Sequence, residues 1–317
     1  MLLRSLLFTC FLTLALGHRA VGQQAPPKPR ILAPGVETTI PSDIVPEETL
    51  SVHPLIELRA KNSLQWTPNY NPESRTLYAK VAEVEFRRQI WCLEFIFKPL
   101  RMVEVDVPQP SGKMQRKLIW YMVYRVRNAG SQLDPQQQED GTFTTAPVAN
   151  EVRFIPQFVL ESNDPELKDA DGRKKAYLDR VIPVAKAPIL RREKPPGEVY
   201  NSVQIASVKI PASTERADRS VWGVVTWENV DPRIDYFSIY IKGLTNAYKW
   251  EDPQGAYRDG SPPGAGRRFV RKELKLNFWR PGDQFNQTEK EIQFGTPAGK
   301  EDLYDVPTGV DYLWLYR

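Results

Sequence analysis

Apolar and polar residues alternate with a period of two along much of this chain, and this alternation constrains the fold more than any other sequence feature. It is clear in residues 82–87, 103–107, 236–241 and 274–278. Successive side chains of a β-strand point to opposite faces of the sheet, so each of these segments predicts a strand with one buried face. Prolines (28) outnumber glycines (18), which also disfavours long helices because proline removes a helical hydrogen-bond donor.

Other segments are apolar on both faces, and we interpret them as interior strands. Residues 91–97 predict a central strand, and residues 118–126 form the most apolar strand of the chain, paired as a hairpin with 103–107 across the turn at 108–112. The remaining expected elements are strands near 152–160, 203–210, 221–227 and 312–316, an edge or bulge at Pro156, a short helix beginning at Asp164, and a mobile, exposed loop at 131–141. The expected fold class is mainly β: an immunoglobulin-like antiparallel β-sandwich with a C-terminal β-hairpin extension.

Composition divides the chain into four parts. Residues 1–22 are expected to be a signal peptide, and the Pro-rich residues 23–74 an extended tether. Residues 75–250 hold the predicted β-sandwich domain. Residues 251–317 begin with a Pro- and Gly-rich linker and end in a β extension that is too small to fold readily alone, so it should pack on the sandwich.

The signal-peptide prediction depends on the first 22 residues. Arg4 precedes an apolar run from residue 6 to residue 17, and the small residues Ala20 and Gly22 suit cleavage before Gln23. The apolar run is too short to span a bilayer, so we expect no transmembrane segment after signal cleavage. The mature protein should be exported, to the periplasm or the extracellular space.

Charge and cysteine content limit the classes of partner and of stabilising bond. Cleavage removes two arginines and no acidic residue, so the formal charge of +4 falls to +2, too small an excess to predict nucleic-acid binding. Cys92 is then the single cysteine, which excludes an intrachain disulfide. About 295 residues can bury enough apolar surface to fold without one. Because Cys92 lies within an apolar strand, we expect a buried, unreactive thiol.

The sequence contains no motif that identifies a catalytic residue, a metal site or a cofactor. The mature chain has one histidine, His53, so a multi-histidine metal site is excluded, and no Gly-x-Ser-x-Gly nucleophile elbow occurs. Residues 163–172 suggest a calcium loop, but with Gly172 at the sixth position, Leu167 and Leu178 occupy the first and twelfth, where a ligand is needed. The glycine-containing segments 112–113, 264–266 and 299–300 lack the spacing of phosphate-binding loops.

Three strand segments carry a resemblance to known proteins: residues 119–128, 222–228 and 235–240. Here the chain resembles exported, functionally unassigned β-rich proteins of planctomycete bacteria. The strand that ends at 128–130 also looks like strands of immunoglobulin-like envelope domains. The resemblance implies export and a β-rich fold, and it brings no catalytic residue with it.

These observations lead to one functional hypothesis and one alternative. The hypothesis is an exported, non-enzymatic envelope protein that acts as a structural or interaction module, with an envelope protein or a polysaccharide as its partner. The alternative is a carbohydrate-binding protein or a carboxylate-dependent glycosidase, since 39 acidic residues leave a catalytic pair open. Trp227, Tyr248 and Trp250 are the candidate binding residues, because aromatic rings stack on sugar faces.

Overall fold

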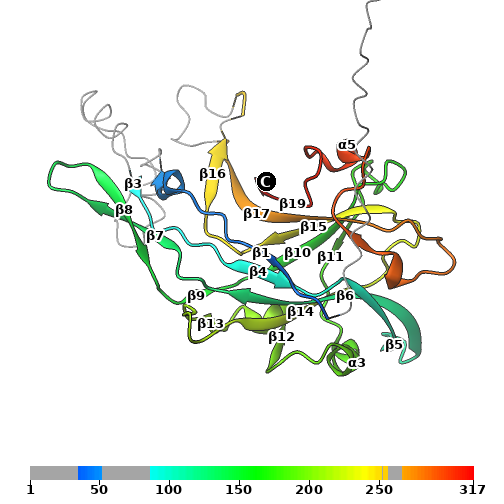
Figure 1. Ribbon diagram of the computed structural model, residues 1–317. Helices are drawn as coiled ribbons and strands as arrows, with labels where there is room; N and C mark the ends of the chain where they lie inside the picture. The colour runs from blue at the N-terminus through cyan, green and yellow to red at the C-terminus, as the bar shows by residue number, and fades with distance from the viewer. Residues whose placement is uncertain (1–34, 52–85, 252, 256–265) are drawn as a thin grey trace, which may run out of the picture.

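The computed structural model describes residues 35–51, 86–251, 253–255 and 266–317, and this part of the chain is mainly β (Figure 1). Two large sheets dominate it. The first sheet runs in the order β1 (Thr38–Ile40), β4 (Glu94–Phe97), β6 (Met114–Arg127), β14 (Val221–Trp227) and β12 (Val199–Asn201), with β5 (Arg101–Pro108) also paired to β6. The second sheet runs in the order β11 (Ala176–Leu178), β10 (Gln157–Ser162), β15 (Tyr236–Lys242), β17 (Arg268–Trp279) and β16 (Tyr248–Glu251), with β18 (Gln293–Phe294) and β19 (Tyr312–Tyr316) also paired to β17. All pairs in these two sheets are antiparallel except β12 with β14.

The two sheets face each other, and the main hydrophobic core fills the space between them (Figure 1). Trp120 of the first sheet contacts Phe237 of the second with ring centroids 5.5 Å apart. Phe97 contacts Phe278 at 6.2 Å in the same way. This arrangement is sandwich-like, and it agrees with the mainly β fold that the alternation predicts. An immunoglobulin-like topology stays a prediction.

Strand β6 is buried on both faces because a helix covers the outer side of the first sheet. Tyr121 and Val123 point away from the main core into a second apolar cluster, which α3 (Pro183–Glu193) closes with Ala185 and Ile189. The sequence did not predict this helix, since Pro188 in its interior argues against one. Burial of its apolar side against the sheet outweighs that local penalty.

Several expected strands occur where the alternation places them. Residues 221–227 and 312–316 are β14 and β19, and residues 103–107 lie within β5. The β5–β6 hairpin is confirmed, with Val103 opposite Ile119. Pro156 lies in the gap between β9 (Val152–Arg153) and β10, as a residue without a backbone donor would.

Three local predictions are wrong. The expected loop at 131–141 lies mostly in a hairpin of β7 (Gln132–Gln137) and β8 (Phe143–Val148), whose cross-strand bonds override its polar composition. The expected strand at 203–210 is replaced by α4 (Ser202–Ile205), a turn and β13 (Lys209–Ile210), which pairs with β9. Asp164 begins no helix, because its carboxylate accepts backbone N–H groups of Asp235 and Tyr236 instead.

The predicted parts of the chain are joined in the fold. Part of the range predicted as a tether belongs to the folded body: β1 pairs with β4, and Glu48 of η1 (Pro46–Thr49) is buried. Strand β2 (Leu50–Ser51) pairs with β3 (Phe86–Arg87). Outside the described residues lie the part of the predicted tether within 52–74, which includes His53, and the predicted signal peptide. The C-terminal strands are an integral part of the second sheet and not an added hairpin, because β17 pairs with β15 over six residue pairs. Two short helices complete the described residues, η2 (Glu289–Glu291) and α5 (Glu301–Tyr304).

Candidate binding cleft

The structure separates the three aromatic residues that the sequence nominated for ligand binding. Trp227 is fully buried in the core, where its ring packs edge-on against Phe158 at 6.4 Å, so it is not available to a ligand. Tyr248 and Trp250 are half-buried and lie two positions apart on β16, which places both on one face of that strand. Trp227 ends an apolar strand, and β14 is covered on both faces, so its ring lies in the core as expected for the end of such a strand.

Tyr248 and Trp250 line a pocket of about 300 Å³, which we call the aromatic pocket. Tyr316 adds a third ring that sequence reasoning did not select. Tyr316 lies on β19 opposite Lys272 of β17, and this register places its ring at the aromatic pocket. The other lining residues are Val45, Glu47, Glu48, Leu50 and Lys249.

Cations of the same chain already cover these rings. The guanidinium carbon of Arg88 lies 3.4 Å from the ring centroid of Tyr248, and Lys249 Nζ lies 4.1 Å from that of Tyr316. Arg267 lies 5.0 Å from the ring centroid of Trp250. A cation over a ring face is attracted by the ring quadrupole and occupies the surface on which a sugar would stack. These contacts argue against the three rings as an open stacking platform.

Beneath the aromatic pocket lies a buried network centred on Lys272. Its Nζ donates to Glu48 Oε1 at 2.6 Å and forms an ion pair with Asp43 at 2.9 Å. Tyr316 donates its hydroxyl to the same Glu48 oxygen at 2.5 Å. Burial alone lowers the pKa of Lys272, but the hydrogen bonds to Glu48 and Asp43 outweigh it, and the net shift is upward. Glu48 is therefore committed to holding the N-terminal segment on β17.

This commitment bears on the glycosidase alternative. Of the residues that line the aromatic pocket, two are acidic, the consecutive Glu47 and Glu48. A glycosidase needs two carboxylates that flank the scissile bond from opposite sides. Consecutive residues of one short helix, one of them bonded to Lys272 and Tyr316, do not supply that arrangement.

On its other side Tyr248 borders a larger hollow of about 490 Å³, which we call the cationic cleft. Three of its lining side chains, Arg153, Lys242 and Arg271, bring positive charge to the cleft surface, and no Asp or Glu is among the lining residues. The complete lining is Trp91, Arg153, Ile155, Pro156, Gln157, Lys242, Gly243, Thr245, Asn246, Ala247, Tyr248, Arg271 and Lys272.

Gly243 lets the two walls of the cleft meet. Its φ is +90°, and a Cβ at this position would lie 2.1 Å from the carbonyl oxygen of Ile155. Only glycine combines this left-handed conformation with so close a backbone approach. The segment between β9 and β10 is thereby held against the segment between β15 and β16.

Polar side chains fix the floor of the cleft. Asn246 accepts a hydrogen bond from the Trp91 backbone N–H at 2.9 Å and donates to the carbonyl of Gln89 at 2.9 Å. The Thr245 hydroxyl donates to the carbonyl of Trp91 at 2.7 Å. These bonds hold Trp91 at the cleft surface.

Two cations of the cleft, Arg153 and Arg271, remain open to a ligand. Arg153 and Arg271 are exposed, and in the described part of the chain neither guanidinium has an ion-pair or hydrogen-bond partner. Lys242 Nζ lies 3.6 Å from Glu273, a carboxylate that is fully buried and whose pKa burial raises. Since an unpaired guanidinium is the preferred bidentate partner of a carboxylate or phosphate, the cleft suits an anionic ligand.

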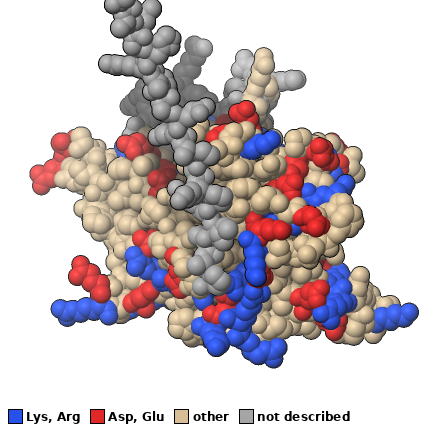
Figure 2. All heavy atoms as spheres, turned by 45° about the vertical axis from the view of Figure 1, so that its right-hand side comes forward, with Lys and Arg blue, Asp and Glu red and all other residues tan. Residues whose placement is uncertain are grey.

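Charge elsewhere on the surface is mixed. On the face shown in Figure 2, Lys and Arg side chains are interspersed with Asp and Glu side chains. Most of the ion pairs involve half-exposed groups, such as Arg125 with Glu37 and Asp218. The cationic cleft is defined by the residues that line it.

Cys92 pairs with Thr245 of the cleft lining in an isolated β-bridge and is buried, with 3% of its surface exposed. Burial raises the pKa of its thiol to about 12. A thiol with so little thiolate at neutral pH is a weak nucleophile. This position agrees with a packing role.

The described residues contain no group of three or more His, Cys, Asp or Glu side chains arranged to hold a metal ion. None of the helices in this part of the chain has the length and apolar character needed to cross a lipid bilayer. Comparison with protein-family models, with curated proteins and with solved structures gave no match for this chain. The described part of the chain is mainly β, with a cationic cleft lined by residues of the second sheet and the segments that flank it.

Proposed function

We propose that this chain is an exported, non-enzymatic interaction module of the cell envelope whose cationic cleft binds an acidic polysaccharide. The observation that carries the proposal is the lining of the cleft, which holds two unpaired arginines, two lysines and no carboxylate. Uronic-acid carboxylates pair with arginine through two parallel hydrogen bonds. Trp91 borders the same cleft and offers an aromatic ring to the apolar side of a sugar.

The signal-like residues 1–22 support export to the periplasm or the extracellular space. The strand segments 119–128, 222–228 and 235–240, which resemble exported planctomycete proteins, point the same way. N-terminal sequencing of the exported protein tests this part, with Gln23 as the expected first residue.

Binding to a soluble polyuronate, measured by titration calorimetry at low and high salt, tests the ligand class. We expect the wild type to bind, with affinity that falls as salt rises because the contacts are between exposed charges. The double variant Arg153→Ala/Arg271→Ala should bind at least about tenfold more weakly. Both side chains are exposed, so its melting temperature should be unchanged.

Arg216→Ala/Arg219→Ala is the matched control, since it removes two exposed arginines and the same charge outside the cleft. The control should bind like the wild type. A neutral glucan of similar length should not bind. Equal losses in the two double variants would mean a general charge effect, and absence of polyuronate binding in the wild type would overturn the proposal.

A further inference from the structure

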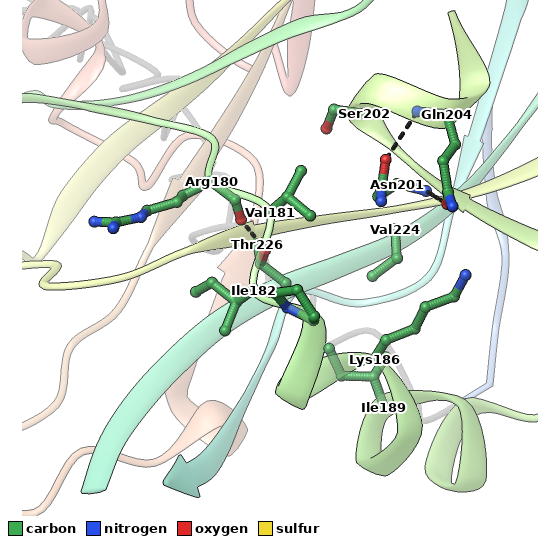
Figure 3. Close-up of a pocket in the computed structure, with 11 residues that line it drawn as sticks. Arg180, Val181, Ile182, Lys186, Ile189, Asn201, Ser202, Gln204, Val224 and Thr226 are labelled. Carbon is green, nitrogen blue, oxygen red and sulfur yellow. Dashed lines mark hydrogen bonds between the residues drawn. The ribbon is translucent and has the colours of Figure 1, made fainter. Parts of the chain in front are cut away.

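A second pocket, of about 280 Å³, lies on the outer side of the first sheet beneath helix α3, away from the cationic cleft (Figure 3). One end is apolar, formed by Ile182 and Ile189 of the α3 region and Val224 of β14. The other end is polar and is formed by Asn201 and Gln204. Figure 3 shows Lys186 reaching from α3 toward that polar end, while Arg180 points away from it.

The hydrogen bonds that cap α4 determine what the polar end can offer. Asn201 Oδ1 accepts the backbone N–H groups of Val203 at 3.0 Å and Gln204 at 2.8 Å. Gln204 Oε1 accepts the backbone N–H of Asn201 at 3.2 Å. Both amide oxygens are thereby used, and because only the oxygen of an amide accepts, the two NH₂ groups are left as donors.

Lys186 adds a third donor with a positive charge. No acidic residue lines the pocket, and within the described ranges no residue accepts a hydrogen bond from the Lys186 amine or from the two amide NH₂ groups. Arg180, at the far rim, is paired with Glu228, and its carbonyl accepts the Thr226 hydroxyl. The pocket therefore has an excess of hydrogen-bond donors, one of them charged, at one end and an apolar wall at the other.

The geometry points to a binding site for a small monocarboxylate with an apolar tail, held by Lys186, Asn201 and Gln204 at its carboxylate and by Ile182, Ile189 and Val224 along its tail. A carboxylate accepts from several donors at once, and a charged donor gives the strongest of these bonds. The volume lies at the small end of the range for ligand pockets, which limits the tail to a short alkyl chain or a single ring. This site shares no residue with the cationic cleft and is independent of the proposed function.

Titration of the mature protein with butyrate, hexanoate and octanoate, followed by calorimetry or by NMR, tests the assignment. Affinity should rise with chain length while the tail fills the apolar end, because each added methylene buries apolar surface. The matched n-alcohols should bind at least about tenfold more weakly, since a hydrogen bond to a charged partner is stronger than one to a neutral partner.

Two variants test the polar end. Lys186→Met keeps an unbranched side chain on α3 and should weaken octanoate binding about tenfold or more. Gln204→Glu keeps an acceptor for the Asn201 N–H, as is usual at this position of a capping box, so α4 should remain folded while the new charge repels the ligand. Arg191→Met, an exposed position of α3 outside the pocket, is the control for charge loss and should bind like the wild type.

Arg153→Ala/Arg271→Ala should also bind octanoate like the wild type, which separates this site from the cationic cleft. Absence of octanoate binding at millimolar concentration would overturn the assignment. Equal binding of octanoate and octanol, or full binding by a folded Gln204→Glu protein, would overturn it as well.

Discussion

At the scale of single residues, burial determines whether a side chain is accessible to a ligand and how its pKa shifts. Trp227 and Trp250 are the same residue type and both were candidate binding residues, yet one is in the core and the other lines a surface pocket. Cys92 shows the same dependence: its apolar neighbours predict burial, and the structure adds the upward pKa shift that burial causes.

The Cys92 shift predicts a pH dependence of stability. The unfolded thiol ionises near pH 9 and the native thiol near pH 12, so the native state favours the neutral form. Its contribution to the free energy of unfolding is therefore complete below about pH 9 and is lost as the pH rises toward 12. Relative to Cys92→Ala, wild-type stability should fall by roughly 1 kcal/mol or more across this window.

Urea unfolding of both proteins at a series of pH values from neutral to alkaline measures the difference. Cys92→Ala should also be less stable at neutral pH because it leaves a small cavity. Parallel stability curves for the two proteins would show that the thiol does not titrate as its burial requires.

At the scale of elements, short-range pattern and long-range contact compete. β14 and β19 form strands as their sequences predict, because each has a neighbouring strand with which to pair. The segment 131–141 becomes mostly strand and hairpin turn although its composition is that of a loop, and α3 forms despite Pro188. In both cases the segment is stabilised by a contact that its own sequence does not indicate. The contact is with β8 for residues 131–141 and with the outer face of the first sheet for α3.

The junction of the cleft walls at Gly243 gives the second prediction. Gly243→Ala should destabilise the protein by about 3 kcal/mol or more, since it combines left-handed strain with a clash against the Ile155 carbonyl. Gly172→Ala is the matched control: its φ is +77°, but a Cβ there would meet no atom within 4 Å. The control should lose only about 1–2 kcal/mol.

Denaturant unfolding of both variants compares the two losses. Gly243→Ala should additionally weaken polyuronate binding, because the cleft walls can no longer approach each other. Similar free-energy losses in the two variants would mean that the backbone moves apart at little cost and that the junction is not rigid.

At the scale of the whole molecule, the second sheet is completed by the last third of the chain. β17 pairs with β15 and contributes Leu274, Leu276 and Phe278 to the main core. η1, from the opposite end of the chain, is held on β17 through Glu48 and Lys272. Segments far apart in sequence thus depend on one another for burial.

The third prediction follows from this interdependence. A protein that ends at residue 250 should not fold cooperatively, because the loss of three core side chains at about 2–5 kcal/mol each approaches or exceeds the 5–15 kcal/mol by which domains are stable. The mature full-length protein should unfold in one transition. Circular dichroism during thermal unfolding distinguishes the two, and a sharp transition in the shortened protein would contradict the prediction.

The sequence by itself determined the mainly β class and the position of most interior strands, because a period-two pattern has one physical solution, a strand with one face in the core. It also determined that Cys92 is buried, since its neighbours are apolar on both sides. The sequence alone did not predict the cationic cleft. Arg153, Arg271 and Trp91 are separated by many residues and carry no shared pattern.

Only the tertiary structure decided that these three side chains surround one hollow, because β10, β15 and β17 must first pair and Gly243 must bring two connecting segments together. It also decided that cations of the same chain cover the rings of Tyr248 and Trp250. Strand formation responds to the pattern of neighbouring residues, whereas a site is defined by distances between segments, and those distances exist only once the sheets have packed.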